Sequence, residues 1–195
     1  MCDLDRVSGF LIAAKIAYIA TLIALGVAML NSASLFAAAA NGPLMIGVIA
    51  GAALATGLYT AALVELDRCA AGVCAAELQP LRNALVALLA TMAVYTTSLG
   101  VLALVAWIPF AGAAAVGAML ALFIGLTVTV STGMEANFIR AVQAYNNCRA
   151  RNGATTIIGA VIALSIFVIF FGLLFVGVGV GTGRIPLTVS FGSSR

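Results

Sequence analysis

Residues 83–134 read NALVALLATMAVYTTSLGVLALVAWIPFAGAAAVGAMLALFIGLTVTVSTGM, a run of 52 residues without a charged side chain. The hydrocarbon core of a bilayer is about 30 Å thick, and a helix needs about 20 apolar residues to cross it. The run is therefore long enough for two crossings, and Pro109 marks a tight turn between them. Because lipid offers no hydrogen-bond partners to the backbone, each crossing is predicted to be a helix.

Two more charge-free runs extend this pattern to the rest of the chain. Residues 16–64 allow two crossings with a turn at Asn41-Gly42-Pro43, and residues 152–183 allow one. The sequence predicts an all-α, polytopic transmembrane bundle in one domain, 1–183, followed by a short tail, 184–195. Its five membrane-spanning helices are expected near 9–38, 43–65, 82–107, 111–145 and 154–178.

The first of these segments is interpreted as a retained helix. Its apolar run is longer than the apolar part of a usual signal peptide, and the amino end is not clearly positive. If it were cleaved, four crossings would remain.

The composition also limits the function. The 195 residues are 64% hydrophobic and only 8% charged, whereas a soluble domain is about 25% charged. The loops leave no room for a catalytic domain, and the absence of histidine excludes histidine-dependent catalysis and ligation. We therefore expect no enzyme activity, no cofactor and no nucleic-acid partner, and we expect the bilayer and other membrane subunits as partners.

The positive charges predict an orientation. Cytoplasmic loops of membrane proteins carry an excess of Lys and Arg. Seven of the nine positive side chains belong to one predicted face, which makes the amino terminus cytoplasmic and the carboxyl terminus external. They are Arg6, Lys15, Arg68, Arg82, Arg140, Arg149 and Arg151, against Arg184 and Arg195 on the other side.

Two further expectations follow from this orientation. Lys15 is predicted to extend to the headgroups of the cytoplasmic face; an ion pair inside the membrane is the alternative. The chain has no Asn-x-Ser/Thr acceptor site, which favours a bacterial inner membrane or, alternatively, an organellar one.

Small residues recur at four-residue spacing in two of the predicted helices. Such ridges let helix backbones approach closely in a membrane. The predicted packing residues are Gly47, Gly51 and Ala55 in the second helix, and Ala113, Gly117, Ala121 and Gly125 in the fourth.

Hydroxyl side chains gather within the predicted membrane segments. They either hydrogen-bond within and between helices or line a weakly polar path for a small neutral solute. The candidates for such a path are Thr56, Tyr59, Thr60, Tyr95, Thr96 and Thr127. Glu65 and Glu135 are interpreted as interface residues.

All four cysteines are predicted on the same face. Cys2, Cys69, Cys74 and Cys148 are expected as free thiols in a reducing cytoplasm. Four thiolates on one face are also a candidate metal site, although a Cys-x4-Cys spacing is not the common one. Disulfides are the third alternative, and they require the reverse orientation.

The fourth helix is predicted to continue beyond the membrane. Met134, Phe138, Val142 and Tyr145 form an apolar stripe at helical spacing. The stripe is either a docking surface for a partner, or it rests on the headgroups or on the 66–81 loop. The glycines at 177, 179, 181 and 183 predict that the fifth helix frays or becomes extended at its end.

These features lead to three hypotheses about function. The first is an accessory or structural subunit of a larger membrane complex. The second is a channel or transporter for a small solute that works as an oligomer. The third is a membrane thiol or metal-binding protein.

Overall fold

The computed structural model describes residues 3–31, 41–69, 74–107 and 113–182, with side chains outside 107–120. These residues are helical throughout most of their length, as predicted. The elements are α1 (Leu4–Leu30), α3 (Gly42–Asp67), α4 (Ala75–Trp107), α5 (Ala113–Val128), the π-helical turn η1 (Thr129–Met134), α6 (Glu135–Arg151) and α7 (Gly159–Gly181). Because α5, η1 and α6 follow one another without a break, the described part contains five helical spans long and apolar enough to cross a membrane.

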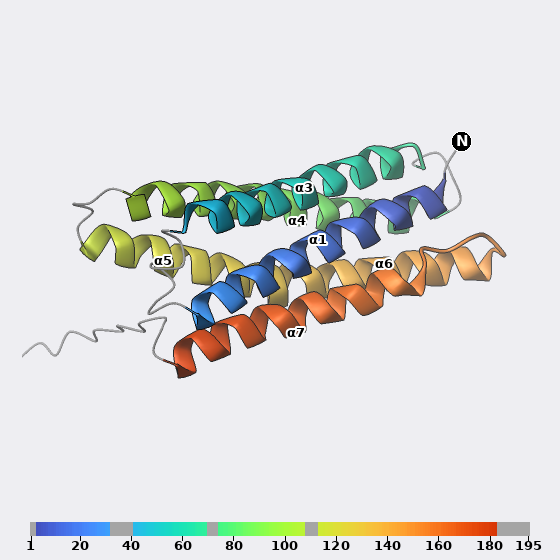
Figure 1. The fold of residues 1–195 in the computed structure, drawn as a ribbon. Helices are drawn as coiled ribbons and strands as arrows, with labels where there is room; N and C mark the ends of the chain where they lie inside the picture. Colours follow the sequence, from blue (N-terminus) through green and yellow to red (C-terminus); the bar gives the residue numbers. More distant parts are fainter. Residues whose placement is uncertain (1–2, 32–40, 70–73, 108–112, 183–195) are drawn as a thin grey trace, which may run out of the picture.

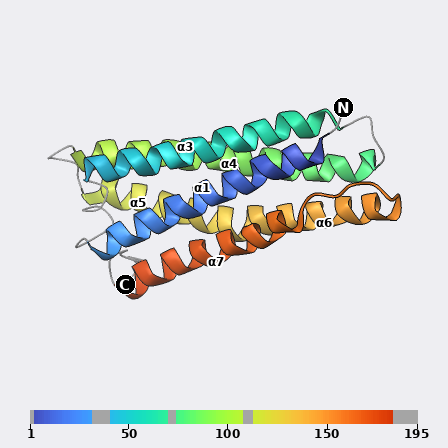
Figure 2. The same cartoon turned by 45° about the vertical axis from the view of Figure 1, so that its right-hand side comes forward.

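The spans lie lengthwise beside one another and close into a ring (Figure 1). α1 packs against α3 and α7, α3 against α4, α4 against α5 and α6, and α6 against α7. Figure 2 shows the same side-by-side arrangement from a second direction. The axis of the ring is filled by side chains, which include the buried Tyr18, Tyr59, Tyr95 and Phe123.

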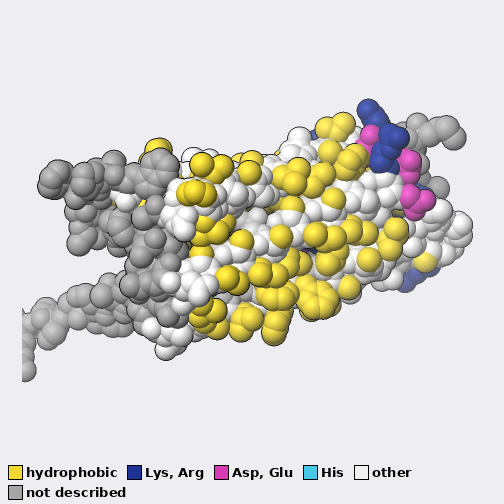
Figure 3. All heavy atoms as spheres, viewed as in Figure 1, with side chains coloured by type: hydrophobic (Ala, Val, Ile, Leu, Met, Phe, Trp, Pro, Cys, Tyr) yellow, Lys and Arg dark blue, Asp and Glu magenta, His cyan; other side chains and the backbone are white. Residues whose placement is uncertain are grey.

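Charged side chains gather at one end of this bundle (Figure 3). α1 starts there and α3 ends there, and Asp3, Arg6, Glu65 and Arg68 belong to it. We call it the charged end, and we call the other end, where no described residue is charged, the uncharged end. The sides between them carry exposed apolar side chains such as Ile46, at 65% exposure. An apolar outer surface suits a lipid environment, because hydrocarbon chains offer no hydrogen-bond partners to polar groups.

The connection from α6 to α7 runs back along α6 (Figure 1). The Asn146 side-chain amide donates to the Ile157 carbonyl oxygen at 3.0 Å and accepts from the Ile157 N–H at 2.8 Å. The Ser8 hydroxyl accepts from the Ile158 N–H at 3.2 Å. These bonds fix the start of α7 against both α6 and α1.

Several helix boundaries differ from those predicted. α1 begins at Leu4 because the Asp3 side chain accepts from the Arg6 N–H at 3.1 Å and caps the helix. α4 begins at Ala75 and includes Pro80 near its start, so that the preceding loop is shorter than expected. The prediction that α7 frays is wrong, because the helix continues to Gly181. In lipid the helix satisfies the backbone, which outweighs the low helix propensity of glycine.

Candidate functional site

Lys15 and Glu135 form an ion pair in the interior of the bundle. Lys15 Nζ lies 2.6 Å from Glu135 Oε2, and both side chains have 0% of their surface exposed. The Tyr59 hydroxyl donates to the second carboxylate oxygen, Oε1, at 3.4 Å. One charge from α1 and one from α6 therefore meet a hydroxyl from α3 at a closed point between the helices.

The prediction that Lys15 extends to the headgroups is therefore wrong. Lys15 lies eleven residues after the first residue of α1, Leu4, which corresponds to about 16 Å along the helix. At that depth a carboxylate across the bundle neutralises the ammonium. Glu135, interpreted from the sequence as an interface residue, is buried as well. Ionisable side chains inside a membrane are rare and are usually paired, as these two are.

Two aromatic rings complete the surroundings of the Lys15 ammonium. Its Nζ lies 4.5 Å from the centroid of the Phe138 ring and 5.6 Å from that of Tyr59. Both distances are within the range of cation–π attraction. The negative faces of the rings add to the stabilisation that the Glu135 carboxylate provides.

The carboxylate follows directly on a π-helical turn. The Glu135 N–H bonds to the Val130 carbonyl oxygen, five residues earlier, instead of the oxygen four residues earlier. The turn shifts the register of the helix, and Ser131 within it and Glu135 directly after it are both fully buried. Such turns are rare and frequently occur at functional sites.

A layer of hydroxyl groups lies next to the ion pair, on the side of the uncharged end. We call Tyr18, Tyr95, Thr127 and Ser131 the hydroxyl layer. The Tyr18 and Tyr95 rings meet edge to face with centroids 5.5 Å apart. Thr127 donates to the Phe123 carbonyl oxygen at 2.9 Å. The hydroxyls of Tyr18, Tyr95 and Ser131 are buried without a hydrogen-bond partner among the described residues.

Aromatic rings cover the hydroxyl layer. The centroid of the Tyr95 ring is 5.1 Å from that of Phe123, and Phe123 is 6.2 Å from Phe175 on α7. Phe138 and Tyr145 are buried on the side of the charged end. The polar groups are thus enclosed between aromatic side chains at both ends.

The six candidates for a solute path lie in four different surroundings. Tyr59 joins the ion pair, while Tyr95 and Thr127 belong to the hydroxyl layer. The Thr56 and Thr96 hydroxyls lie 3.3 Å apart between α3 and α4. Thr60 is exposed and donates to the carbonyl oxygen of Thr56 on its own helix. They do not form one continuous lining in the described structure.

Two of the three residues in the predicted packing ridge of α3 lie at close-packed positions, and the third does not. A Cβ added at Gly51 would lie 2.6 Å from Thr21 Oγ1, and Ala55 is fully buried. A Cβ at Gly47 meets nothing within 4 Å.

The second ridge runs along α5. Ala121 and Gly125 are exposed, and the side chains at 113 and 117 are outside the described set, so that Ala113 and Gly117 are placed only by their helix. Glycine instead approaches closely on α7, where Gly172 faces Ser131.

The stripe considered as a docking surface lies inside the chain. Phe138, Val142 and Tyr145 are buried, and Met134 is half-buried. These side chains pack within the bundle and are not available to a partner in this structure.

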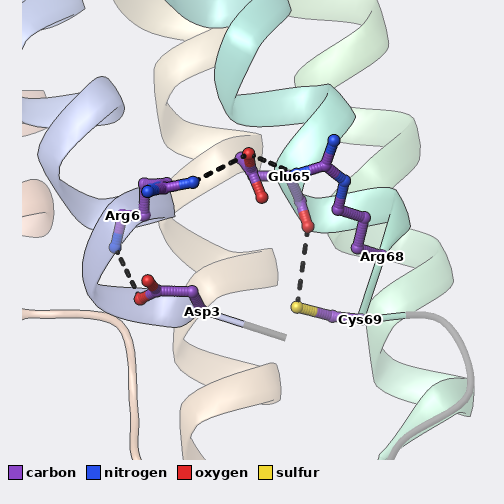
Figure 4. A network of polar contacts seen from close by, with 5 residues as sticks. All are labelled: Asp3, Arg6, Glu65, Arg68 and Cys69. Carbon is purple, nitrogen blue, oxygen red and sulfur yellow. Dashed lines mark hydrogen bonds and ion pairs between the residues drawn. The ribbon is translucent and has the colours of Figure 1, made fainter. Parts of the chain in front are cut away.

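Salt bridges join the helices at the charged end. Glu65 pairs with Arg68 at 2.7 Å on α3 and with Arg6 at 3.7 Å on α1 (Figure 4). Asp67 pairs with Arg82 on α4 at 2.6 Å. Because these pairs are exposed or partly exposed, each contributes little stability.

The cysteines in the described part are disulfide-bonded, so the expectation of free thiols is wrong. Cys74, before α4, is bonded to Cys148 on α6. Cys69 is disulfide-bonded as well, and Cys2 lies outside the described residues. Cys74, Cys148 and Glu77 have their ligand atoms within 4.8 Å of one another. The two sulfurs are bonded to each other, however, and a metal needs them as thiolates.

Sequence reasoning missed the pairing of Lys15 with Glu135 and the π-helical turn. Lys15 and Glu135 are separated by 120 positions. The signal was present in the two charges themselves, since each borders a long apolar run. Comparisons of this chain with family models, with curated proteins and with solved structures found no match.

Proposed function

We propose that this protein is a small membrane transporter that moves protons, with Lys15 and Glu135 as its working site. The observation that carries the proposal is the ion pair buried between α1 and α6, 2.6 Å from nitrogen to oxygen. Ionisable groups inside a membrane commonly mark ion pathways and proton relays. This favours the second hypothesis from the sequence, transport, over an accessory role.

Stability alone is a poor reason for such a pair. Removing two charges from water is costly, and well-packed apolar side chains are often as stabilising as a buried ion pair. A carboxylate that alternately holds and releases a proton gives the pair a use. Protonation of Glu135 removes its charge, leaves the Lys15 ammonium without a counter-charge and so weakens the contact between α1 and α6. A site that binds between helices near the middle of the membrane is typical of transporters.

An accessory subunit remains a prediction without a specific contact in its favour. The aromatic side chains of α7 that face outward, Phe167 and Phe170, are 52% and 57% exposed. Lipid covers such side chains as well as a neighbouring subunit does. Oligomerisation and subunit partners remain predictions too.

Proton flux into vesicles tests the proposal. Purified protein is reconstituted into liposomes that contain a pH-sensitive dye, and a potassium diffusion potential drives protons inward. We expect the wild type to conduct well above protein-free vesicles. The variant K15M/E135Q, which has neither charge, should be about 100-fold slower, the typical contribution of a positioned proton-transfer group.

A matched variant separates the loss of flux caused by removing the ion pair from a loss that any substitution in the bundle would cause. Thr60→Ala removes an exposed hydroxyl that bonds only within its own helix, so flux should stay at the wild-type value. Wild-type flux no faster than empty vesicles, or equal flux from K15M/E135Q, contradicts the proposal.

We further propose that the charged end faces an oxidising compartment, with the amino terminus external and the carboxyl terminus inside. The Cys74–Cys148 disulfide supports this, because disulfides are rare in the cytosol and persist in compartments such as the bacterial periplasm. The number of Lys and Arg residues on each side favours the opposite orientation. Lys15 does not count towards that number, however, because it is paired with Glu135 inside the bundle and does not lie at the membrane interface. The inner membrane of a bacterium, with its oxidising outer side, suits this placement.

Thiol labelling of sealed right-side-out membrane vesicles tests the orientation. An impermeant maleimide polymer should label Cys74 and Cys148 only after treatment with an impermeant reductant. Labelling without reductant would show free thiols. Labelling only after detergent opens the vesicles would place the charged end inside, and either result overturns the proposed orientation.

A further inference from the structure

Three buried hydroxyl groups near the ion pair take no part in the hydrogen bonds between the described helices. Tyr18, Tyr95 and Ser131 have side chains whose polar atoms find no hydrogen-bond partner among the described residues. Tyr18 and Tyr95 have 0% exposure, as does Ser131. A buried hydroxyl without a partner is destabilising. Three such groups in one layer, beside a buried carboxylate, therefore call for an explanation beyond packing.

Their positions connect them to Glu135. Ser131 precedes Glu135 by four residues across the π-helical turn, and Tyr18 follows Lys15 by three residues on the same face of α1. The Tyr18 ring meets the Tyr95 ring with centroids 5.5 Å apart, and Lys15, one turn before Tyr18, contacts the Glu135 carboxylate at 2.6 Å.

The series continues towards the uncharged end. The Tyr95 ring lies between those of Tyr18, at 5.5 Å, and Phe123, at 5.1 Å, and Thr127 follows Phe123 by one turn on α5. Tyr18 and Tyr95 come from α1 and α4, so the series crosses the interior of the ring rather than following one helix.

Hydroxyl groups in such a series are able to pass protons. Each one donates one hydrogen and accepts through its oxygen lone pairs. A hydroxyl that already donates to a fixed acceptor does this poorly, because its hydrogen is committed. Thr127, for example, donates to a backbone oxygen of its own helix. Tyr18, Tyr95 and Ser131 have no such commitment.

We propose that Tyr95 and Tyr18, with Ser131 beside them, are a proton relay that connects Glu135 with the uncharged end of the bundle. The inference rests on the proposed function and names the route that the proton takes to the ion pair. A hydronium ion releases a proton to the Tyr95 oxygen and remains as water, while the Tyr95 O–H bond breaks and its hydrogen passes to the Tyr18 oxygen. The Tyr18 O–H bond breaks in turn, and its hydrogen forms the new O–H bond of the Glu135 carboxyl group.

The step balances, because the water side loses one proton and the Glu135 carboxyl group gains one. Both tyrosines end as neutral phenols with their hydrogens reversed in direction, and only Glu135 changes its charge. Phe123 and Phe175 cover Tyr95 on the side from which the proton arrives. Access for water therefore requires these rings to move, which makes them the closing element of the relay.

Phenylalanine variants test the relay, because they remove the hydroxyl and keep the ring. Y18F and Y95F are assayed in the same proteoliposomes as the wild type, with flux divided by the amount of folded protein. We expect each to lower the proton flux about 100-fold, as loss of a proton-transfer group does. Y145F is the matched control. Tyr145 is buried with a hydroxyl that lacks a partner, but it lies ten residues beyond Glu135, towards the charged end, so its flux should stay at the wild-type value.

The outcomes separate the relay from the proposed function. Wild-type flux in Y18F and Y95F overturns the relay and leaves transport through Glu135 intact. An equal loss in Y145F overturns it as well, because the effect then follows from any buried hydroxyl. Absence of flux in the wild type itself removes the proposed function and the relay together. If one of the two tyrosine variants does not fold, the proton flux of the other tests the relay.

Discussion

Replacing Glu135 with Gln should lower the free energy of unfolding by about 3–5 kcal/mol, the usual cost of breaking a buried ion pair on one side. The reason is the Lys15 ammonium, which keeps two aromatic rings beside it but loses its only counter-charge in the described structure. Removing both charges, in K15M/E135Q, should cost much less, because no charge is then left unpaired. The double variant K15M/E135Q should therefore be more stable than the single variant E135Q.

Reversible unfolding in mixed detergent measures this difference. Wild type, E135Q, K15M and K15M/E135Q form a double-mutant cycle, whose coupling term isolates the pair. Glu77→Gln is a suitable control, since Glu77 is outside the bundle interior. Additive losses in the cycle would mean that Lys15 and Glu135 do not act on each other.

Alanine at Gly172 should destabilise the protein by about 1–3 kcal/mol, the usual cost of overpacking. A Cβ at this position would lie 2.6 Å from Ser131 Cβ and still closer to Ser131 Oγ. Ser131 belongs to the π-helical turn, so its backbone cannot retreat without disturbing Glu135 four residues later. The effect should therefore appear in proton flux as well as in stability.

Gly177 on the same helix provides the control. A Cβ there meets nothing within 4 Å, so Gly177→Ala should be neutral or stabilising by up to about 1 kcal/mol through helix propensity. Thermal unfolding of both variants in detergent gives the comparison. Equal stability of the two would show that α7 does not pack closely on the π-helical turn.

The sequence predicted the number and type of spans because lipid leaves few choices. Charge-free runs such as 83–134 are long enough to cross twice, and a backbone in lipid must be helical. The requirement for a helical backbone in lipid holds whatever the helix propensity of the residues. For this reason α7 stays helical through its glycines to Gly181.

The ion pair was harder to predict for two physical reasons. Hydrophobic runs do not indicate which helices meet, and α1 and α6 bring together positions 120 residues apart. The expected start of the first helix, near residue 9, also placed Lys15 at the interface. The Asp3 cap moves that start to Leu4 and Lys15 inward with it.

Candidates from the hydroxyl pattern were informative only in part. Tyr59, Tyr95 and Thr127 lie in the interior near the pair, whereas Thr60 faces outward. Helical spacing indicates which residues share a face, but not which face the other four helices cover. Tyr18 and Ser131 were not among the candidates for the path. Ser131 lies one turn before Glu135 along the helix, and the pairing of Lys15 with Glu135 brings Tyr18, one turn after Lys15, towards the same point.

We propose that Glu135 takes up and releases the transported proton inside the folded bundle. Infrared difference spectra between an alkaline and an acidic sample detect the carbonyl stretch of a carboxyl group that gains a proton. We expect such a band in the wild type from a group shielded from water, and its loss in E135Q. A spectrum without this band, or the same band in E135Q, would contradict the assignment of Glu135 as the proton-carrying group.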